Sequence, residues 1–144
     1  MATFVKFNCF TEHLAEKVHN LGADTLTVAL TSSPNAPNAS THTQLSDLTQ
    51  ISYTNLSTRV LGNTTGSSSQ TGGQYKLVVS PDLVLTSSPG TTGPFRYVVV
   101  YNDTAVSPPD ALIGYYDYGS EITLQAGETL TLDFDQSAGL LTIT

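Results

Sequence analysis

The pattern of apolar and polar side chains predicts β-strands along most of the chain. In residues 95–102 the odd-numbered positions share one face and the even-numbered positions share the other, and both sets are largely apolar. A strand with two apolar faces is typical of a central position, covered on each side by the domain or by a second subunit. Shorter strands are expected at residues 57–61, 75–79, 83–85, 112–118, 122–125, 128–134 and 140–144. The strands at 122–125 and 128–134 are expected to form a hairpin across Ala126 and Gly127.

The N-terminal part of the chain changes from strand to helix and back to strand. Residues 3–9 alternate loosely and suit a short strand or an extended arm. Apolar side chains then recur at helical spacing, which predicts an amphipathic helix from the N-cap Thr11 to Leu21, with Gly22 ending it. Residues 24–31 return to a period of two and predict a half-buried strand with one apolar face.

Two polar segments interrupt the strands. Residues 32–40 contain Pro34 and Pro37 and predict a long surface loop, followed by a brief helical turn at 44–50. Loops of this length are uncommon in a compact domain unless they have a task, and contact with a neighbour is the simplest one. The second segment, residues 62–74, contains Gly, Ser, Thr, Asn and Gln, and is interpreted as the tip of a mobile hairpin or as an ordered contact arm in an assembly.

The regular spacing of the strands, with turn residues between them, predicts an all-β fold. The expected fold class is an antiparallel sandwich or jelly-roll-like domain with one short N-terminal α-helix. Nothing in the sequence marks a domain boundary, so residues 1–144 are expected to form a single β-rich structural domain with an N-terminal arm and helix. A chain of this length buries on the order of two-thirds of its unfolded surface without cross-links.

Composition and charge narrow the range of functions. Only 12% of the residues are charged, about half the usual share, so solvation depends largely on hydroxyl and amide side chains. The net charge is −7, and the five cationic residues are scattered along the chain rather than clustered. Because nucleic-acid binding requires a basic surface, DNA and RNA are not expected partners.

The single cysteine and the absence of targeting segments indicate where the chain folds. Cys9 excludes an internal disulfide and favours a reducing compartment, and no Cys-His catalytic signature surrounds it. The N-terminus lacks the basic segment and apolar core of a secretion signal. No apolar run approaches the roughly 20 residues that span a bilayer. The chain is therefore expected to be made in a cytoplasm and to have no membrane partner.

No combination of residues in the sequence forms a recognisable reactive site. Asp133 and Asp135 are two apart in an expected strand and share a face, as paired acid–base carboxylates or calcium ligands would, but a solvated strand face also explains them. His13, His19 and His42 lack metal-ligand spacing, since the first two are expected on different sides of the helix. Nucleophile, phosphate-loop and dinucleotide motifs are missing. The chain is expected to have no catalytic residue, metal or cofactor, and not to be an enzyme.

Three tyrosines lie close together in one expected strand. Side chains alternate along a strand, so at least one of Tyr115, Tyr116 and Tyr118 must point away from the core. Tyrosine is favoured at interfaces because its ring packs while its hydroxyl keeps a hydrogen bond. Core packing with ordinary exposure, or a sugar-binding platform, are the alternatives.

Arg96 and Asp117 are oppositely charged residues on adjacent expected strands. Their neighbours in the sequence are largely apolar, so the two side chains are predicted to form a buried ion pair across the sheet. Removal of one partner of such a pair costs roughly 3–5 kcal/mol, because the other charge is left without compensation.

Six short segments carry a resemblance to a known class of proteins. They are LAEKVHNLG at 14–22, TLTVALT at 25–31, GPFRY at 93–97, YND at 101–103, LIGYYDYG at 112–119 and GETL at 127–130. Together they resemble small structural proteins of tailed bacteriophages, and most of all head decoration or cement proteins. The resemblance covers most of the chain apart from its two polar loops and is strongest at residues 95–134.

The resemblance implies a non-enzymatic virion protein on the outer capsid surface, made in a bacterial host cytoplasm. Decoration proteins bind the major capsid protein and stabilise the expanded head, so the expected partners are that protein and further copies of this chain in a dimer or trimer. Because the shared segments are packing motifs, a tail, baseplate or fibre-associated protein that binds a receptor or glycan is the alternative. A hydrolase that uses Asp133 and Asp135 is the third hypothesis. The side chains considered for capsid or subunit contacts are Phe4, Phe7, Phe10, Tyr115, Tyr116 and Tyr118.

Overall fold

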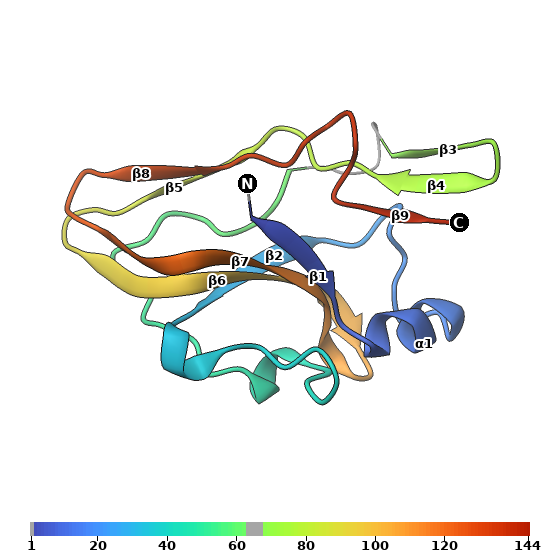
Figure 1. Ribbon diagram of the computed structural model, residues 1–144, viewed down its shortest axis with the longest axis horizontal. Helices are drawn as coiled ribbons and strands as arrows, with labels where there is room; N and C mark the ends of the chain where they lie inside the picture. The colour runs from blue at the N-terminus through green and yellow to red at the C-terminus, as the bar shows by residue number, and fades with distance from the viewer. Residues whose placement is uncertain (1, 63–67) are drawn as a thin grey trace.

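Two antiparallel β-layers face each other across an apolar core in the computed structural model, which describes residues 2–62 and 68–144 (Figure 1). This arrangement confirms the expected all-β sandwich with a short N-terminal helix. Residues 63–67 of the polar segment 62–74 lie outside the described residues. The elements in chain order are β1 (Thr3–Lys6), α1 (Cys9–Ala15), β2 (Leu26–Thr31), the 3-10 turns η1 (Ser33–Asn35) and η2 (Leu45–Asp47), β3 (Ser69–Thr71), β4 (Gln74–Leu77), β5 (Leu83–Thr86), β6 (Thr92–Val106), β7 (Pro109–Leu124), β8 (Thr129–Leu132) and β9 (Leu141–Ile143).

The first layer is built around a long hairpin formed by β6 and β7. Its strands lie in the order β1-β7-β6-β2, and neighbouring strands are antiparallel. The turn lies between Val106 and Pro109, so residues 103–110 form the end of this hairpin rather than a separate loop. Strand β7 also runs through the two strands expected separately at 112–118 and 122–125. Register shifts let the pairing continue past irregular positions, which the local sequence pattern does not reveal.

One of these irregularities changes which side chains of β6 share a face. A register shift between Phe95 and Tyr97 interrupts the alternation of the strand. Phe95 consequently packs with Val98 between the layers, whereas Val99 and Tyr101 pack on the outer face. The expected grouping of Phe95 with the other odd-numbered positions is therefore wrong. The expected burial of both faces of this strand is confirmed.

The second layer consists of two antiparallel ladders that follow one another along the chain. Strand β4 pairs with β9 and strand β5 pairs with β8, while β3 extends the layer beside β4. Gly72 and Gly73 form the turn between β3 and β4 with φ angles of 61° and 85°. Positive φ at both central residues is what a two-residue hairpin turn requires, and glycine adopts it without strain.

Residues 125–128 carry the chain from the first layer to the second (Figure 1). The hairpin expected across Ala126 and Gly127 is wrong, because β7 stays paired with β6 as far as Leu124 and β8 pairs with β5 instead. The backbone N–H of Gly127 donates to the carbonyl oxygen of Ser87 at 2.6 Å, which ties this crossing to the end of β5.

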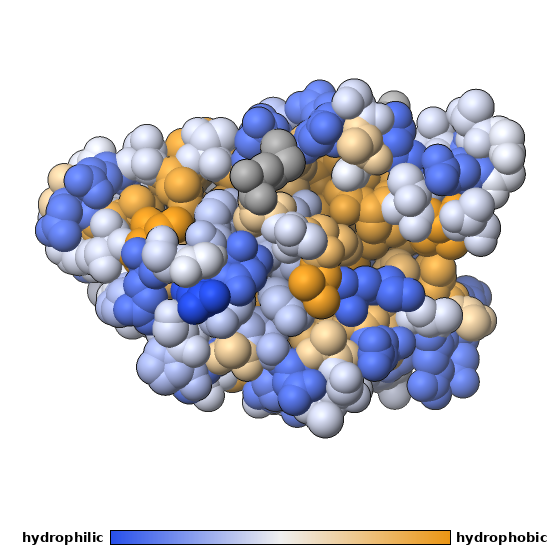
Figure 2. Space-filling view, in the orientation of Figure 1, coloured by the Kyte–Doolittle hydropathy of each residue, from blue (hydrophilic) through white to orange (hydrophobic). Residues whose placement is uncertain are grey.

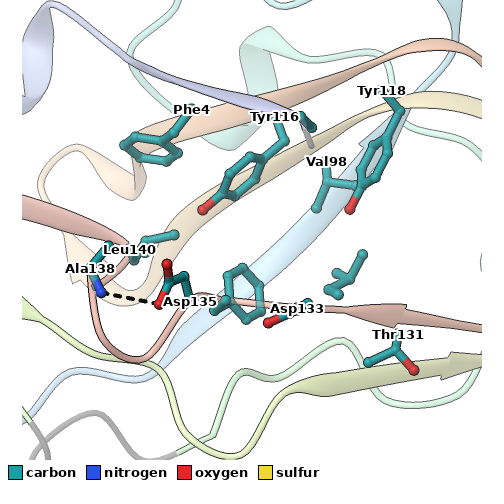
Figure 3. A pocket seen from close by; sticks show the side chains of 13 residues that line it. Phe4, Val98, Tyr116, Tyr118, Thr131, Asp133, Asp135, Ala138 and Leu140 are labelled. Atoms are coloured by element: carbon teal, nitrogen blue, oxygen red, sulfur yellow. Dashed lines mark hydrogen bonds between the residues drawn. The ribbon is translucent and has the colours of Figure 1, made fainter.

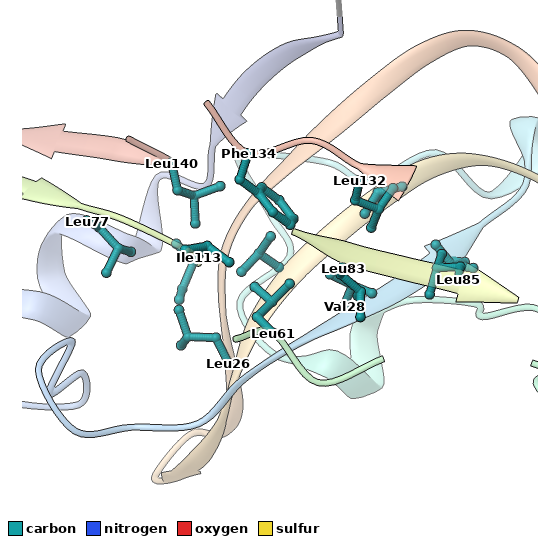
Figure 4. Packing of buried hydrophobic residues seen from close by; sticks show 14 of the residues in the cluster. Leu26, Val28, Leu61, Leu77, Leu83, Leu85, Ile113, Leu132, Phe134 and Leu140 are labelled. Carbon is teal, nitrogen blue, oxygen red and sulfur yellow. The ribbon is translucent and has the colours of Figure 1, made fainter. Parts of the chain in front are cut away.

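Aliphatic and aromatic side chains from both layers fill the space between them (Figure 4). Burial of one such side chain contributes about 1.5–3 kcal/mol, so this inner core is the main source of stability. Its buried members include Leu26, Val28, Leu61, Leu77, Leu83, Leu85, Phe95, Val98, Ile113, Leu132, Phe134 and Leu140.

A second apolar cluster covers the outer face of the first layer. The segment after β2 folds back over this face, where Leu48 packs against Phe7 and Leu112. Backbone bonds attach the segment, since the N–H of Leu112 donates to the carbonyl oxygen of Thr43 at 3.0 Å. As a result β2 is buried at every position, and the expected half-buried strand is wrong. Of the long loop expected at 32–40, Ala39 packs against this cluster while most of the loop is exposed or partly exposed, and its contact with a neighbour stays a prediction.

The two long edges of the sandwich differ. Residues 56–61 close one edge, because the N–H of Leu61 donates to the carbonyl oxygen of Leu26 in β2 and that of Ser57 to Thr86 in β5. These residues make isolated bridges instead of the strand expected at 57–61. At the opposite edge, β1 and β9 end their sheets with no further strand paired to them among the described residues. We call this second edge the open edge.

The helix ends earlier than the sequence predicts. After the helix the chain turns at Lys17, which has a φ of 66°. The N–H of Val18 donates to the carbonyl oxygen of His13 at 2.8 Å, and the N–H of Lys17 donates to that of Leu14 at 3.3 Å. This is the Schellman arrangement, in which a left-handed residue, usually glycine, ends the helix. The expected helix from Thr11 to Leu21 is wrong at both ends, because α1 begins at Cys9 and ends at Ala15. The residue with left-handed backbone after the helix is Lys17 rather than Gly22.

Gly114 allows β1 to lie against β7, and its substitution should loosen that contact. A Cβ atom at Gly114 would clash with the ring of Phe4 and would lie 2.8 Å from the carbonyl oxygen of Val5. We expect Gly114→Ala to lower the free energy of unfolding by about 1–3 kcal/mol in urea denaturation, as overpacking does. Gly22→Ala is the control, because its new Cβ would meet its nearest neighbour at 3.6 Å. Equal stability of the two variants would contradict this packing of β1.

Candidate functional site

A cavity of about 320 Å³ lies at the open edge, between the first layer and the segment that follows β8. In Figure 3, Phe4, Tyr116 and Tyr118 lie on one side of this space, and Asp133 and Asp135 lie on the other. The cavity is lined by Ala2, Phe4, Val98, Tyr116, Tyr118, Thr131, Leu132, Asp133, Phe134, Asp135, Ala138, Gly139 and Leu140.

Phe4, Tyr116 and Tyr118 form one wall of the cavity, and Phe134 faces them from the segment after β8. Tyr116 and Tyr118 are two apart in β7 and therefore point to the same side of the sheet. The ring of Phe4 lies 5.2 Å from that of Tyr116 and is inclined to it by 55°, and the ring of Phe134 lies 6.1 Å from Tyr116. The rings thus surround a space rather than form one flat platform.

The two tyrosine hydroxyls are available to a ligand. Burial, followed by the neighbouring Tyr118, raises the pKa of Tyr116 to about 12, and burial also raises the pKa of Tyr118. Both groups therefore stay protonated near neutral pH. Neither hydroxyl has a hydrogen-bond partner within residues 2–62 and 68–144, and both are turned toward the segment after β8 in Figure 3.

The carboxylates of Asp133 and Asp135 lie in the opposite wall. Strand β8 ends at Leu132, so both residues are in a loop rather than in the strand expected at 128–134. Asp135 holds that loop, because its Oδ1 accepts hydrogen bonds from the N–H of Ser137 at 2.8 Å and of Ala138 at 3.1 Å. Asp133 is exposed and has no hydrogen-bond partner in the described part of the chain.

This arrangement does not favour acid–base catalysis by the two carboxylates. The hydroxyl of Ser137 and the backbone N–H groups of Ala138 and Ser137 lower the pKa of Asp135. A general acid requires the opposite shift, produced by burial or by a second negative charge. Asp135 is therefore suited to holding the loop, and Asp133 remains free to contact a ligand.

A second groove of about 520 Å³ continues along the open edge. It lies between β1 and α1 on one side and β9 on the other, with Lys6, Leu14 and Ile143 among its lining residues. Phe4 lines both spaces and so stands between them. In Figure 2, apolar residues gather between the two layers on the face that carries β1.

The side chains proposed for intermolecular contacts divide into three groups. Phe4, Tyr116 and Tyr118 come together in the cavity and are partly exposed. Tyr115 is also partly exposed but lies on the outer face, 5.3 Å from Phe7. Phe7 and Phe10 are 0% and 2% exposed and belong to the two apolar clusters of the domain, so the prediction of surface contacts is wrong for both.

Arg96 and Asp117 form an ion pair with two hydrogen bonds. Arg96 Nε donates to Asp117 Oδ1 at 2.7 Å, and Nη2 donates to Oδ2 at 3.0 Å. The side chains are 30% and 37% exposed, so the expectation that this pair is buried is wrong. Solvent screening leaves an exposed pair much less stabilising than the buried pair expected from the sequence.

A buried polar cluster links the segment after α1 to β6. Asn102 Nδ2 donates to His19 Nδ1 at 3.0 Å and to Asp24 Oδ2 at 2.6 Å, while its Oδ1 accepts the N–H of Thr104 at 2.9 Å. An amide nitrogen only donates, so Nδ1 of His19 is the acceptor and the proton of the neutral ring lies on Nε2. Burial, then the nearby His13, lowers the pKa of His19 to about 4.

The histidines are closer together than their sequence spacing suggests. His19 lies beyond the end of α1, and its ring centroid is 5.9 Å from that of His13. His13 Nδ1 and His19 Nε2 are buried without a hydrogen-bond partner among the described residues. Even so, no group of three or more His, Cys, Asp or Glu side chains in residues 2–62 and 68–144 could hold a metal ion.

Cys9 is suited to packing rather than to nucleophilic chemistry. Its Sγ lies 3.7 Å from the carbonyl oxygen of His42 and 3.9 Å from those of Thr43 and Leu112. Burial raises the pKa of the thiol, which reduces the fraction of reactive thiolate.

Comparison of the chain with protein-family models, with curated proteins and with solved structures gives no match. Among the described residues, α1 and the two 3-10 turns fall far short of a helix that spans a membrane.

Sequence reasoning identified several residues of the cavity without placing them together. The aromatic spacing in β7 and the acidic pair at 133 and 135 were both visible in the sequence. Their convergence was not, because it depends on the pairing of β1 with β7 and on the loop that Asp135 holds. Ala138, Gly139 and Leu140 carry no chemical signal that would have marked them.

The buried state of His19 predicts a loss of stability in acid. Its folded pKa of about 4 lies below its ordinary value of 6.5, so the unfolded chain takes up a proton more readily as the pH falls. The contribution of neutral His19 is complete above pH 6.5 and is lost toward pH 4, by roughly 2–3 kcal/mol after allowance for partial solvation. Urea denaturation across this range should show the loss, and His19→Gln should reduce its slope. An unchanged slope in His19→Gln would contradict this assignment.

The exposed ion pair predicts unequal effects of removing its two partners. Arg96→Ala should change thermal stability only slightly, and less at high ionic strength, because the pair is screened by solvent and salt. Asp117→Ala should be more harmful, since Asp117 Oδ1 also accepts the N–H of Gly119 at 2.7 Å. Thermal unfolding at two salt concentrations tests this, and a large loss in Arg96→Ala would show that the pair acts as a buried one.

Proposed function

We propose that this protein is a non-enzymatic component of a tailed-bacteriophage virion, a decoration protein that binds the major capsid protein on the outside of the expanded head. The open edge of the sandwich is the observation that carries this proposal. Strands β1 and β9 end their sheets there, and partly exposed Phe4, Tyr116 and Tyr118 lie between them. Unpaired strand edges and aromatic side chains are favourable sites for a second protein.

The surroundings of the reactive side chains support a binding role. Asp135 holds a loop, the pKa of the Cys9 thiol is raised, and His19 is bonded to Asn102 within the domain. Asp135 and His19 therefore help to hold the fold together, and the raised pKa of Cys9 reduces its reactive thiolate. A rigid sandwich whose polar groups hold its own loops can present one side of itself to a partner without rearrangement.

Stabilisation of the capsid would follow from mass action. A protein that binds the expanded shell and not its alternatives stabilises that shell in proportion to its occupancy. Association of this chain into a dimer or trimer would add avidity, because neighbouring copies would engage neighbouring capsid subunits. The net charge of −7 favours solubility before assembly.

The aromatic cavity favours a second candidate function. Rings beside carboxylates also occur where proteins bind sugars, so a tail, baseplate or fibre-associated protein that binds a receptor or glycan is the alternative. This alternative predicts affinity for cell-surface saccharides, whereas the decoration function predicts affinity for the capsid.

Co-sedimentation with expanded capsids that lack this protein tests the proposed function, with isolated tails and unexpanded capsids as parallel samples. We expect saturable binding to expanded capsids and recovery of their heat resistance when the protein is added back. Binding to tails alone, or to none of the particles, would overturn the decoration function. Binding to expanded capsids without any gain in heat resistance would overturn the stabilising mechanism.

A further inference from the structure

We propose that the cavity at the open edge receives a lysine or arginine side chain of the partner protein, held against the rings of Phe4, Tyr116 and Tyr118 and facing Asp133. This inference rests on the proposed function only for the identity of the protein that carries the basic side chain. The recognition chemistry follows from the cavity itself.

The arrangement of the rings suits a cation. Phe4 and Tyr116 are inclined to each other by 55° with their centroids 5.2 Å apart, and Tyr118 lines the same space. A positive charge over the face of an aromatic ring is attracted by the electrons of that face, with more effect where water is excluded. Several inclined rings can contact one ammonium or guanidinium group from different sides.

The charged side chains that line the cavity are acidic. Asp133 and Asp135 line it, and no lysine, arginine or histidine does so within residues 2–62 and 68–144. Lys76 is not among the lining residues, although its Nζ donates to the carbonyl oxygen of Ser137 at 2.8 Å and its charge helps to lower the pKa of Asp135. Asp135 already accepts hydrogen bonds from its own loop, whereas Asp133 has no partner in the described chain. A cation would therefore find one carboxylate free to pair with it and a second one nearby, which is the charge complementarity expected of an interface.

The tyrosine hydroxyls of the cavity also favour a cationic ligand. The hydroxyls of Tyr116 and Tyr118 have no partner in the described residues. A phenolic oxygen can accept a hydrogen bond, and ammonium and guanidinium groups only donate. The ligand that uses these oxygens together with Asp133 is thus one rich in donors.

The size and floor of the cavity favour one side chain over an extended saccharide. Its volume of about 320 Å³ is near the lower limit for small-molecule sites. Val98, Leu132 and Leu140 supply apolar surface, which matches the aliphatic stem of lysine or arginine. Sugar rings are instead favoured by a flat aromatic face, and the rings here are inclined.

The position of the cavity makes it accessible from the open edge. Ala2 and Phe4 line the cavity and belong to the N-terminal segment and β1, and β1 has no strand paired to its other side among the described residues. A partner segment lying along this edge can place one long basic side chain between the layers. This geometry is side-chain insertion beside a strand edge.

Small cationic probes test the chemistry of the cavity directly. We would titrate the full chain with n-propylguanidinium and n-butylammonium chloride, and with methyl glucoside and sodium acetate for comparison, following amide and aromatic shifts by NMR. We expect saturable shifts at Phe4, Tyr118 and Leu140 with the cations, weakening with salt, and none with acetate. Saturation by methyl glucoside without cation binding would overturn the inference in favour of a sugar site. No saturable shift with any probe would also overturn it.

Matched variants show whether the proposed residues are responsible. Asp133→Asn should weaken cation binding about tenfold, while Glu16→Gln, which removes the same charge from the exposed end of α1, should not. Tyr118→Leu should weaken binding more than Tyr118→Phe, because phenylalanine keeps the ring face. Circular dichroism would check that each variant is folded. Unchanged affinity in Asp133→Asn, or equal effects of the two Tyr118 variants, would contradict the proposed site.

Capsid binding by the same variants separates this inference from the proposed function. If the wild-type protein binds capsids and Asp133→Asn binds at least about tenfold more weakly, the basic side chain belongs to the capsid protein. Equal capsid binding by the two proteins would overturn the inference and leave the decoration function standing. Absence of wild-type binding would overturn the decoration function, and the probe titration alone would then decide the chemistry of the cavity.

Discussion

The long β6–β7 hairpin has two apolar faces, and the rest of the molecule is arranged to cover them. Phe95, Val98 and Ile113 face the second layer, whereas Val99 and Leu112 face the segment after β2. Exposure of either face would leave a row of large apolar side chains in water, at about 25 cal/mol for each Å². The second layer covers one of these faces, and the segment after β2 covers the other.

With both faces covered, the unpaired backbone groups of the sandwich lie at its edges. Residues 56–61 bond to β2 and β5 and close one edge, whereas β1 and β9 leave the other open. The open edge also holds the cavity (Figure 3). Among the described residues, partly exposed aromatic side chains and unpaired strand edges occur together at this edge, which makes it a favourable site for a partner.

Polar groups in this protein mainly hold the chain in place. Asn102 joins β6 to Asp24 and His19, Asp135 holds the loop after β8, and Asp117 binds both Arg96 and the backbone of Gly119. The contacts of Asp135 hold one wall of the cavity before any ligand arrives, which lowers the ordering cost of binding. Asp133 and the hydroxyls of Tyr116 and Tyr118 differ from these groups, because they have no partner in the described residues.

The sequence by itself determined the all-β class, the central position of β6 and the pairing of Arg96 with Asp117, because each depends on local alternation or on adjacent strands. Tertiary structure decided the burial of Phe7 and Phe10, the register shift beside Phe95, the strand partner of β8, and the meeting of the tyrosines with Asp133. These features depend on contacts between segments far apart in the chain. A period of two shows that a strand has two faces, but only the layers packed against it decide what each face meets.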